Sequence, residues 1–244
     1  MDLSFFYFEF HIGSFLLSAH DVFEFLGYLV GYRYYKYLQK RGDAYNSKER
    51  TILFIATLCG AYLGSKSLGY LEHLQDVNVE SGKTIVGGLL GGLLFVEIAK
   101  KIMHCTKSSG DLITFPIILG LIIGRIGCFL SGLKDGTHGM QTSLPWGIDL
   151  GDGVLRHPVQ IYEILFLILL FFIIQSYEKY YKNFSDGNKF ISFLFPYLVF
   201  RFLVEFIKPI SIFFIGLSAI QIACLIGILY YTAILISKQF FRTP

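Results

Sequence analysis

The stretch that decides the fold runs from Gly124 to Glu163 and reads GRIGCFLSGLKDGTHGMQTSLPWGIDLGDGVLRHPVQIYE. It joins two long apolar segments through a polar loop, places Arg125 inside the first segment, and places RHPVQIYE at the entrance to the second. An arginine within hydrocarbon is costly and generally faces protein, water or a ligand. The stretch therefore indicates both a membrane-spanning fold and a candidate active site.

Apolar runs of membrane-spanning length dominate the rest of the chain. Of its 244 residues, 54% are hydrophobic and 17% are aromatic. A hydrocarbon core of ~30 Å needs about 20 apolar residues per helix, and the runs predict an all-α membrane protein with seven transmembrane helices. The predicted spans begin near Val22 and then cover residues 51–70, 84–100, 112–133, 158–176, 190–207 and 211–236. We expect them to form a single polytopic membrane domain over residues 1–244.

The distribution of basic residues predicts the orientation of these spans. Most of the 21 Lys and Arg residues lie in the C-terminal tail and in the loops near residues 33–50, 100–107 and 179–189. Cytoplasmic loops are enriched in Lys and Arg, so we expect these segments inside, and the N-terminus and the 133–157 loop outside. Residues 5–20 alternate apolar and polar in part, which is typical of a short strand or an interfacial segment.

Composition argues against other kinds of protein. The formal charge of +3 comes with basic residues at helix ends, so it gives no indication of nucleic-acid binding. The cysteines are scattered without CxxC spacing, so neither a zinc site nor a disulfide framework is indicated; they are Cys59, Cys105, Cys128 and Cys224. The N-terminal residues MDLSFFYFEF lack a basic segment and a small-residue cleavage site, so we expect no removable signal peptide.

Glycines recur in the second and third spans. Gly60, Gly64 and Gly69 form a stripe suited to close packing on a neighbouring helix. The segment TIVGGLLGG (84–92) favours helix contact as well, although a glycine-rich turn can also expose backbone N–H groups to an anion. The following span starts after SSGD (108–111), which is typical of a helix N-terminus.

Charged residues within the spans indicate a phosphate site. With the predicted orientation, the outer half of the membrane holds Arg125, His157, Glu163, Arg201 and Glu205. The planar donor fork of arginine makes charge-assisted hydrogen bonds to phosphate and stays protonated when desolvated. Two arginines can therefore hold a lipid phosphodiester and stabilise the charge of a departing phosphate.

Each of these residues also has a purely structural interpretation. Arg201 and Glu205 are spaced to form an i,i+4 pair that locks the helix, and Arg125 can extend its side chain to outer headgroups. His157 is a candidate proton acceptor because imidazole titrates near neutrality, or it anchors the fifth helix through a backbone carbonyl. Glu163 favours the positive end of that helix. Gln160 and Tyr162 are candidates for positioning a polar headgroup.

Four segments resemble the bacterial prolipoprotein diacylglyceryl transferases, and they occur in that family's order. They are GRIGCF (Gly124–Phe129), LPWGI (Leu144–Ile148), RHPVQIYE (Arg156–Glu163) and FRFLVEF (Phe200–Phe206). Weaker matches are FLGYLVGY (Phe25–Tyr32), LGSKSLGY (Leu63–Tyr70) and GGLLGG (Gly87–Gly92). Any one tetrapeptide is weak evidence, but the ordered set covers nearly the whole chain.

The resemblance implies a seven-span enzyme of the bacterial cytoplasmic (inner) membrane that needs no metal or organic cofactor. Its substrates would be phosphatidylglycerol, drawn from the membrane lipids, and the lipobox cysteine in the signal peptide of a preprolipoprotein. The products would be a thioether and glycerol phosphate. By the same resemblance, Arg125 and Arg201 would bind the phosphate-bearing headgroup, Glu205 would support Arg201, and His157, Gln160 and Tyr162 would line the site.

Four polar positions of the family pattern are changed in this chain. Cys128 stands where the family usually has Asn, and Leu133 where it has Glu; Val86 replaces a His, and Leu26 replaces a Tyr. Because Val86 cannot accept a proton, a mechanism that uses that histidine as base is excluded. The alternatives are His157 as base, catalysis by the arginines, a phospholipid-using transferase with a different acceptor, or a non-catalytic lipid-binding membrane subunit.

Overall fold

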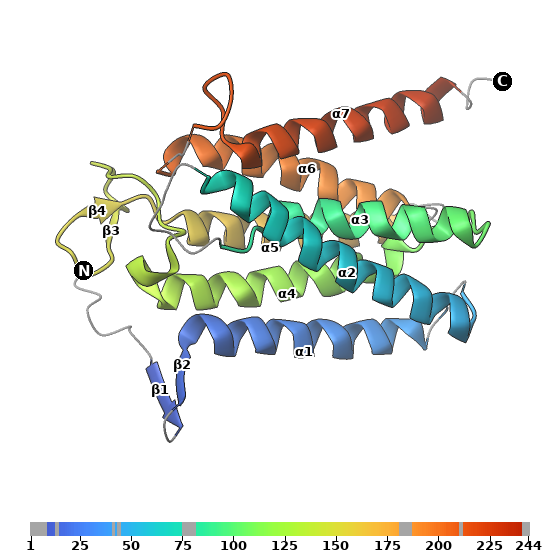
Figure 1. Ribbon diagram of the computed structural model, residues 1–244, viewed down its shortest axis with the longest axis horizontal. Coiled ribbons are helices and arrows are strands. Elements are labelled where there is room, and N and C mark those ends of the chain that lie inside the picture. Colours follow the sequence, from blue (N-terminus) through green and yellow to red (C-terminus); the bar gives the residue numbers. More distant parts are fainter. Residues whose placement is uncertain are drawn as a thin grey trace. The chain divides into compact units, whose positions relative to one another are not determined.

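The computed structural model describes residues 9–12, 15–40, 42, 45–74, 82–180, 187–209 and 212–240. These residues form seven α-helices, two short 3-10 helices and two small hairpins (Figure 1). The chain divides into two compact units. The first comprises Met1–Asp43, Ser109–Phe193 and Ile207–Pro209, and the second comprises Ala44–Ser108, Leu194–Phe206 and Ile210–Pro244. Each unit is described by itself.

The first unit begins with a hairpin and a long helix. The strands β1 (Glu9–Ile12) and β2 (Phe15–Ser18) pair antiparallel, which confirms the strand interpretation of this segment. Ser18 then begins α1 (Ala19–Gln39) through a capping box, in which its hydroxyl accepts from the Asp21 N–H at 3.1 Å. The helix therefore starts at Ala19, three residues before the predicted start.

Helix α1 packs along α4 (Gly110–Leu130), the helix that carries Arg125. The two backbones approach closely at Gly27, where an added Cβ would lie 2.8 Å from the Gly120 carbonyl oxygen. Such contact between backbones requires small residues at the crossing. The glycines of α4 thus position α1 directly beside the arginine-bearing helix.

The predicted 133–157 loop folds into short elements between α4 and α5. A 3-10 turn, η1 (Gly132–Asp135), ends at Gly136 with φ +66°, a left-handed conformation that glycine adopts readily. The strands β3 (Ile148–Asp149) and β4 (Leu155–Arg156) pair antiparallel. Helix α5 (Val159–Tyr180) follows Pro158, whose carbonyl accepts from the Tyr162 N–H at 3.1 Å. The chain thereby returns to α4, on which α5 packs.

In the second unit, α2 (Ser47–Glu72) and α3 (Ile85–Ile102) pack through the predicted glycines. A Cβ on Gly64 would collide with the Gly87 carbonyl oxygen, and one on Gly60 would collide with that of Gly91. The packing interpretation of both glycine segments is therefore confirmed.

Helix α6 (Asn188–Val204) continues into the 3-10 helix η2 (Glu205–Ile207). Its first residues belong to the first unit, where the Asp111 carboxylate accepts from the N–H groups of Gly187 at 2.7 Å and Lys189 at 3.0 Å. The SSGD segment was predicted to start α4. Ser109 does occupy the N-cap position, but it makes no side-chain cap bond. Its neighbour Asp111 instead satisfies the start of another helix.

The last helix, α7, covers Ala219–Phe240, so the predicted start of the seventh span near residue 211 is wrong. The described residues 212–218 instead form a turn in which Phe214 and Leu217 bridge and Gly216 has φ +75°. The helix begins after Ser218, whose hydroxyl accepts from the Gln221 N–H at 3.1 Å. Apolar composition alone does not reveal this turn, because both the turn and the helix are apolar.

Among the described residues, five helical segments are long and apolar enough to cross a membrane. They are Ser47–Glu72, Gly110–Leu130, Val159–Tyr180, Asn188–Ile207 and Ala219–Ser237. Helices α1 and α3 are the other two of the seven predicted spans. Both carry several charges, and α3 has Glu97, Lys100 and Lys101 within its 18 residues. The prediction of a helical membrane protein is supported, with five spans supported by composition.

Candidate active site

Arg125 forms a buried ion pair with Glu163. Its Nε atom lies 2.9 Å from Glu163 Oε2, which joins the last turn of α4 to the first turn of α5. The two residues are only 6% and 1% exposed. A buried charge must be compensated by a partner, so the pair fixes the arginine within the first unit. Glu163 is therefore more than a favourable charge at a helix N-terminus, and sequence reasoning did not reveal its partner.

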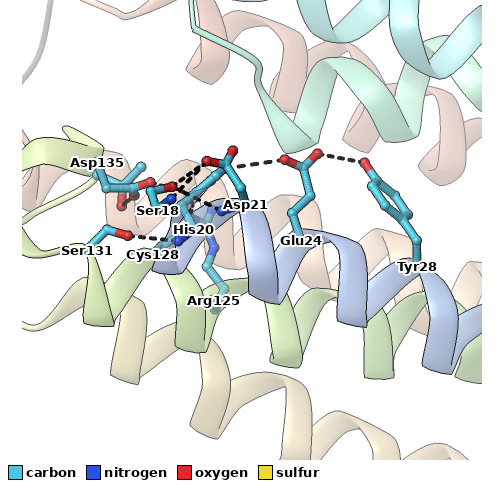
Figure 2. A network of polar contacts seen from close by, with 10 residues as sticks. Ser18, His20, Asp21, Glu24, Tyr28, Arg125, Cys128, Ser131 and Asp135 are labelled. Carbon is cyan, nitrogen blue, oxygen red and sulfur yellow. Dashed lines mark hydrogen bonds and ion pairs between the residues drawn. The ribbon is translucent and has the colours of Figure 1, made fainter. Parts of the chain in front are cut away.

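Cys128 lies one turn after Arg125 and links it to α1. The Arg125 Nη1 atom donates to Cys128 Sγ at 3.7 Å, and the same sulfur lies 3.6 Å from His20 Nδ1. His20 Nδ1 also lies 2.7 Å from Asp135 Oδ1 in η1 (Figure 2). Sequence reasoning missed His20 and Asp135, because nothing in their spacing to Cys128 indicates that the three residues meet.

A chain of hydrogen bonds runs from Asp135 to Gln160. The Thr137 hydroxyl donates to the Asp135 carboxylate and accepts from Gln160 Nε2 at 3.3 Å. Burial alone would raise the pKa of Asp135, but the hydrogen bonds from His20 and Thr137 outweigh it and hold the pKa below its usual value. Gln160 is buried, and its Oε1 atom has no hydrogen-bond partner among the described residues. That oxygen is available to accept from a ligand.

His157 and Tyr162 lie together at the start of α5. His157 Nδ1 lies 3.4 Å from the Tyr162 hydroxyl, which also accepts from Trp146 Nε1 at 2.8 Å. The backbone of His157 is anchored as well, because its N–H donates to the Met140 carbonyl at 3.0 Å and its carbonyl accepts from Val159 at 2.9 Å. The structural interpretation of this histidine as an anchor of α5 is confirmed, and its side chain keeps a polar partner.

Arg201 and Glu205 form a buried pair in the second unit. Arg201 Nη2 lies 3.0 Å from Glu205 Oε2, and the residues are 5% and 2% exposed, which confirms the predicted i,i+4 contact. Nearby elements of this unit are tied by Glu72, whose carboxylate accepts from the Ile220 N–H at 3.1 Å and so caps α7. Sequence reasoning did not single out Glu72, since its partner lies far along the chain.

The changed family positions have different surroundings. Val86 is buried in α3, and Leu26 lies on α1 with 39% of its surface exposed. Leu133 lies in η1, two residues before Asp135. Cys128 is the changed position that directly contacts Arg125.

Comparison with known proteins agrees with this arrangement. A family model described as prolipoprotein diacylglyceryl transferase matches residues 8–237. The phosphatidylglycerol–prolipoprotein diacylglyceryl transferase of Wolbachia pipientis wMel is 34% identical over 62% of this chain and 63% of its own length. The protein with the same name in Clostridioides difficile is 32% identical over 61% of this chain and 58% of its own length.

A third relative of that name, from Pasteurella multocida, is 32% identical over 75% of this chain and 73% of its own length. The matched part of the chain thus spans about three-fifths of the Wolbachia and Clostridioides proteins, at 63% and 58% of their lengths. The family model, however, matches from residue 8 to residue 237, which includes the elements carrying both buried arginines. On this evidence the chain belongs to the prolipoprotein diacylglyceryl transferase family.

Proposed function

We propose that this protein transfers a diacylglyceryl group from phosphatidylglycerol to the thiol of a lipobox cysteine in a preprolipoprotein. The step forms a thioether and releases glycerol phosphate. The observation that carries the proposal is the buried Arg125, held by Glu163 at 2.9 Å within the matched family region. A positioned guanidinium stabilises negative charge that develops on a departing phosphate.

The site residues take separate roles in this proposal. Arg125 and Arg201 each bind phosphate oxygens, and Glu163 and Glu205 hold the two guanidinium groups in place. Gln160 Oε1, a buried acceptor, receives a hydrogen bond from a glycerol hydroxyl. Tyr162 orients His157, which accepts the proton that the thiol loses.

The proposed setting is the bacterial cytoplasmic (inner) membrane. The two units together make one polytopic domain of seven spans, with the N-terminus outside and the C-terminus in the cytoplasm. Five helices that are apolar and long enough to span support the multi-pass arrangement, and the excess of Lys and Arg on one side supports the orientation.

The direct test uses purified protein in vesicles that contain headgroup-labelled phosphatidylglycerol and a lipobox peptide. We expect release of labelled glycerol phosphate and a peptide mass increased by one diacylglyceryl group. A peptide with serine in place of the cysteine is the control and should remain unmodified. Folded protein that consumes no lipid would contradict transfer, and lipid consumption without peptide modification would indicate a different acceptor.

A further inference from the structure

Three side chains from distant parts of the first unit converge beside Arg125. His20 lies in the first turn of α1, Cys128 in the last turn of α4, and Asp135 at the end of η1 (Figure 2). One donor atom of each lies within 4.8 Å of the others. Cys128 is buried and the Asp135 side chain is 5% exposed, whereas the His20 side chain is 39% exposed. The cluster is thus enclosed on the protein side and accessible past His20.

The separation of these donor atoms suits a tetrahedral zinc ion. Zinc bonds of about 2.3 Å to sulfur and 2.0 Å to nitrogen place the two donors about 3.6 Å apart at the tetrahedral angle. His20 Nδ1 and Cys128 Sγ are 3.6 Å apart. Asp135 Oδ1 lies 2.7 Å from the same nitrogen, which is a hydrogen-bond length. An ion that replaces the shared proton needs a carboxylate movement of less than about 1 Å.

The surrounding residues orient the cluster as the neighbours of metal ligands usually do. His20 Nε2, the nitrogen that faces away from the cluster, lies 3.5 Å from Glu24 Oε2, and Glu24 accepts from the Tyr28 hydroxyl at 2.9 Å. A carboxylate behind a ligating histidine fixes its tautomer and ring orientation. Thr137 donates to the carboxylate of Asp135, and Ser131 accepts from the His20 backbone N–H at 3.0 Å.

The charges of the cluster also suit a divalent cation. A thiolate on Cys128 and the carboxylate of Asp135 together balance two positive charges. Arg125 Nη1, at 3.7 Å from the sulfur, favours the thiolate form that a metal requires. The positive charge of this arginine is itself compensated by Glu163. The guanidinium therefore lies next to a metal site without opposing it.

We propose that His20, Cys128 and Asp135 bind a zinc ion and that the open fourth position receives the acceptor thiol. The second half of this proposal rests on the proposed function. Three protein ligands leave one position for a substrate, and a thiol bound to a metal is deprotonated. The site thus supplies the activation that a base at Val86 cannot give.

The transfer step balances as follows. Coordination releases the thiol proton to His157, and the bound thiolate sulfur then attacks the glyceryl carbon that carries the phosphate. A carbon–sulfur bond forms while the carbon–oxygen bond breaks, and its electron pair leaves with glycerol phosphate. Arg125 stabilises that charge beside the metal. No oxidant or reductant is required.

Metal binding is tested on the full-length protein in detergent, by zinc content and by cobalt substitution. We expect one zinc per chain and, with Co²⁺, an absorption band from thiolate-to-cobalt charge transfer. Cys128→Asn, Cys128→Ser and His20→Gln should lose the band and bind metal at least tenfold more weakly. Cys59→Ser and His138→Ala are matched controls outside the cluster and should keep both. A wild-type protein without bound metal, or a Cys128→Ser variant that keeps the band, would overturn the site.

The role of the metal is tested with the lipobox peptide. Adding the peptide to the cobalt protein should change the charge-transfer band, whereas the serine peptide should leave it unchanged. Chelation should reduce transfer at least tenfold, and zinc should restore it. Full transfer by metal-free protein would overturn the role of the metal and leave the proposed function intact. Metal binding without any transfer would have the reverse meaning, because the site would stand and the proposed function would fail.

Discussion

The ion pair between Arg125 and Glu163 is the residue-scale feature on which the candidate site depends. Both side chains are almost completely buried, and each compensates the charge of the other. Removing one member of a buried pair leaves an uncompensated charge and costs about 3–5 kcal/mol. Stability and activity are therefore coupled at this position, and experiments must separate them.

A double-mutant cycle separates the two effects. Arg125→Gln and Glu163→Gln should each destabilise the protein by about 3–5 kcal/mol, and the double variant should lose less than their sum. Transfer should be abolished wherever Arg125 is absent, including in the more stable double variant. Arg156→Gln, which removes the guanidinium from a partly exposed pair with Asp152, is the control and should change stability far less. Unfolding and transfer assays on the same samples check the prediction; an active double variant would exclude Arg125 from catalysis.

A second prediction concerns the hydroxyl of Tyr162, which contacts both His157 and Trp146. Tyr162→Phe should reduce kcat/KM for the lipobox peptide by roughly tenfold, since a lost hydrogen bond costs about 1 kcal/mol and His157 loses its orientation. Trp146→Phe removes one of the two contacts and leaves His157 paired, so its effect should be smaller. Equal effects of the two substitutions would contradict a positioning role of Tyr162 toward His157.

At the scale of elements, glycines determine how closely helices pack. In the second unit, the backbones of α2 and α3 touch at Gly64 and Gly87, where a Cβ on either residue would meet the carbonyl oxygen of the other. Gly88 lies next along α3, but an added Cβ there would be 3.6 Å from its nearest neighbour, an ordinary contact. The two kinds of glycine form a matched pair for experiment.

Gly64→Ala should destabilise the second unit by about 1–3 kcal/mol, because the helices must separate to accept the methyl group. Gly88→Ala adds the same methyl group without a clash and should be neutral or stabilise by up to about 1 kcal/mol through helix propensity. Thermal unfolding in detergent measures both. Equal destabilisation would show that the close approach of the backbones is unimportant.

At the scale of the whole molecule, the testable property is orientation in the membrane. Alkaline phosphatase, which is active only outside the cytoplasm, should be inactive when fused after Ser237 and active when inserted in the 151–153 turn. The reason is the excess of Lys and Arg in the loops on one side of the spans. A fluorescent protein that folds only in the cytoplasm is the control and should give the opposite pattern. Activity at the C-terminal fusion would reverse the proposed topology.

Much of the architecture was predictable because its signals are local. Hydropathy identified each helical segment, and alternation identified the strands near residues 9–18. The four-residue spacing of Arg201 and Glu205 was enough to predict their pair, because one helix carries both up to its final turn. The start of α7 was misplaced because the turn at 212–218 is as apolar as the helix, and its signals are only Gly216 and the cap at Ser218.

The sequence by itself determined the helical membrane class, the family motifs and the two arginines. Only the tertiary structure decided that Arg125 meets Glu163 and that His20, Cys128 and Asp135 converge. The reason is physical: periodicity and hydropathy act within one element, whereas contacts between residues 20 and 128 depend on how α1 crosses α4 at Gly27 and Gly120. Scattered cysteines and histidines therefore indicated no metal site in the sequence, although the folded chain brings three ligands together.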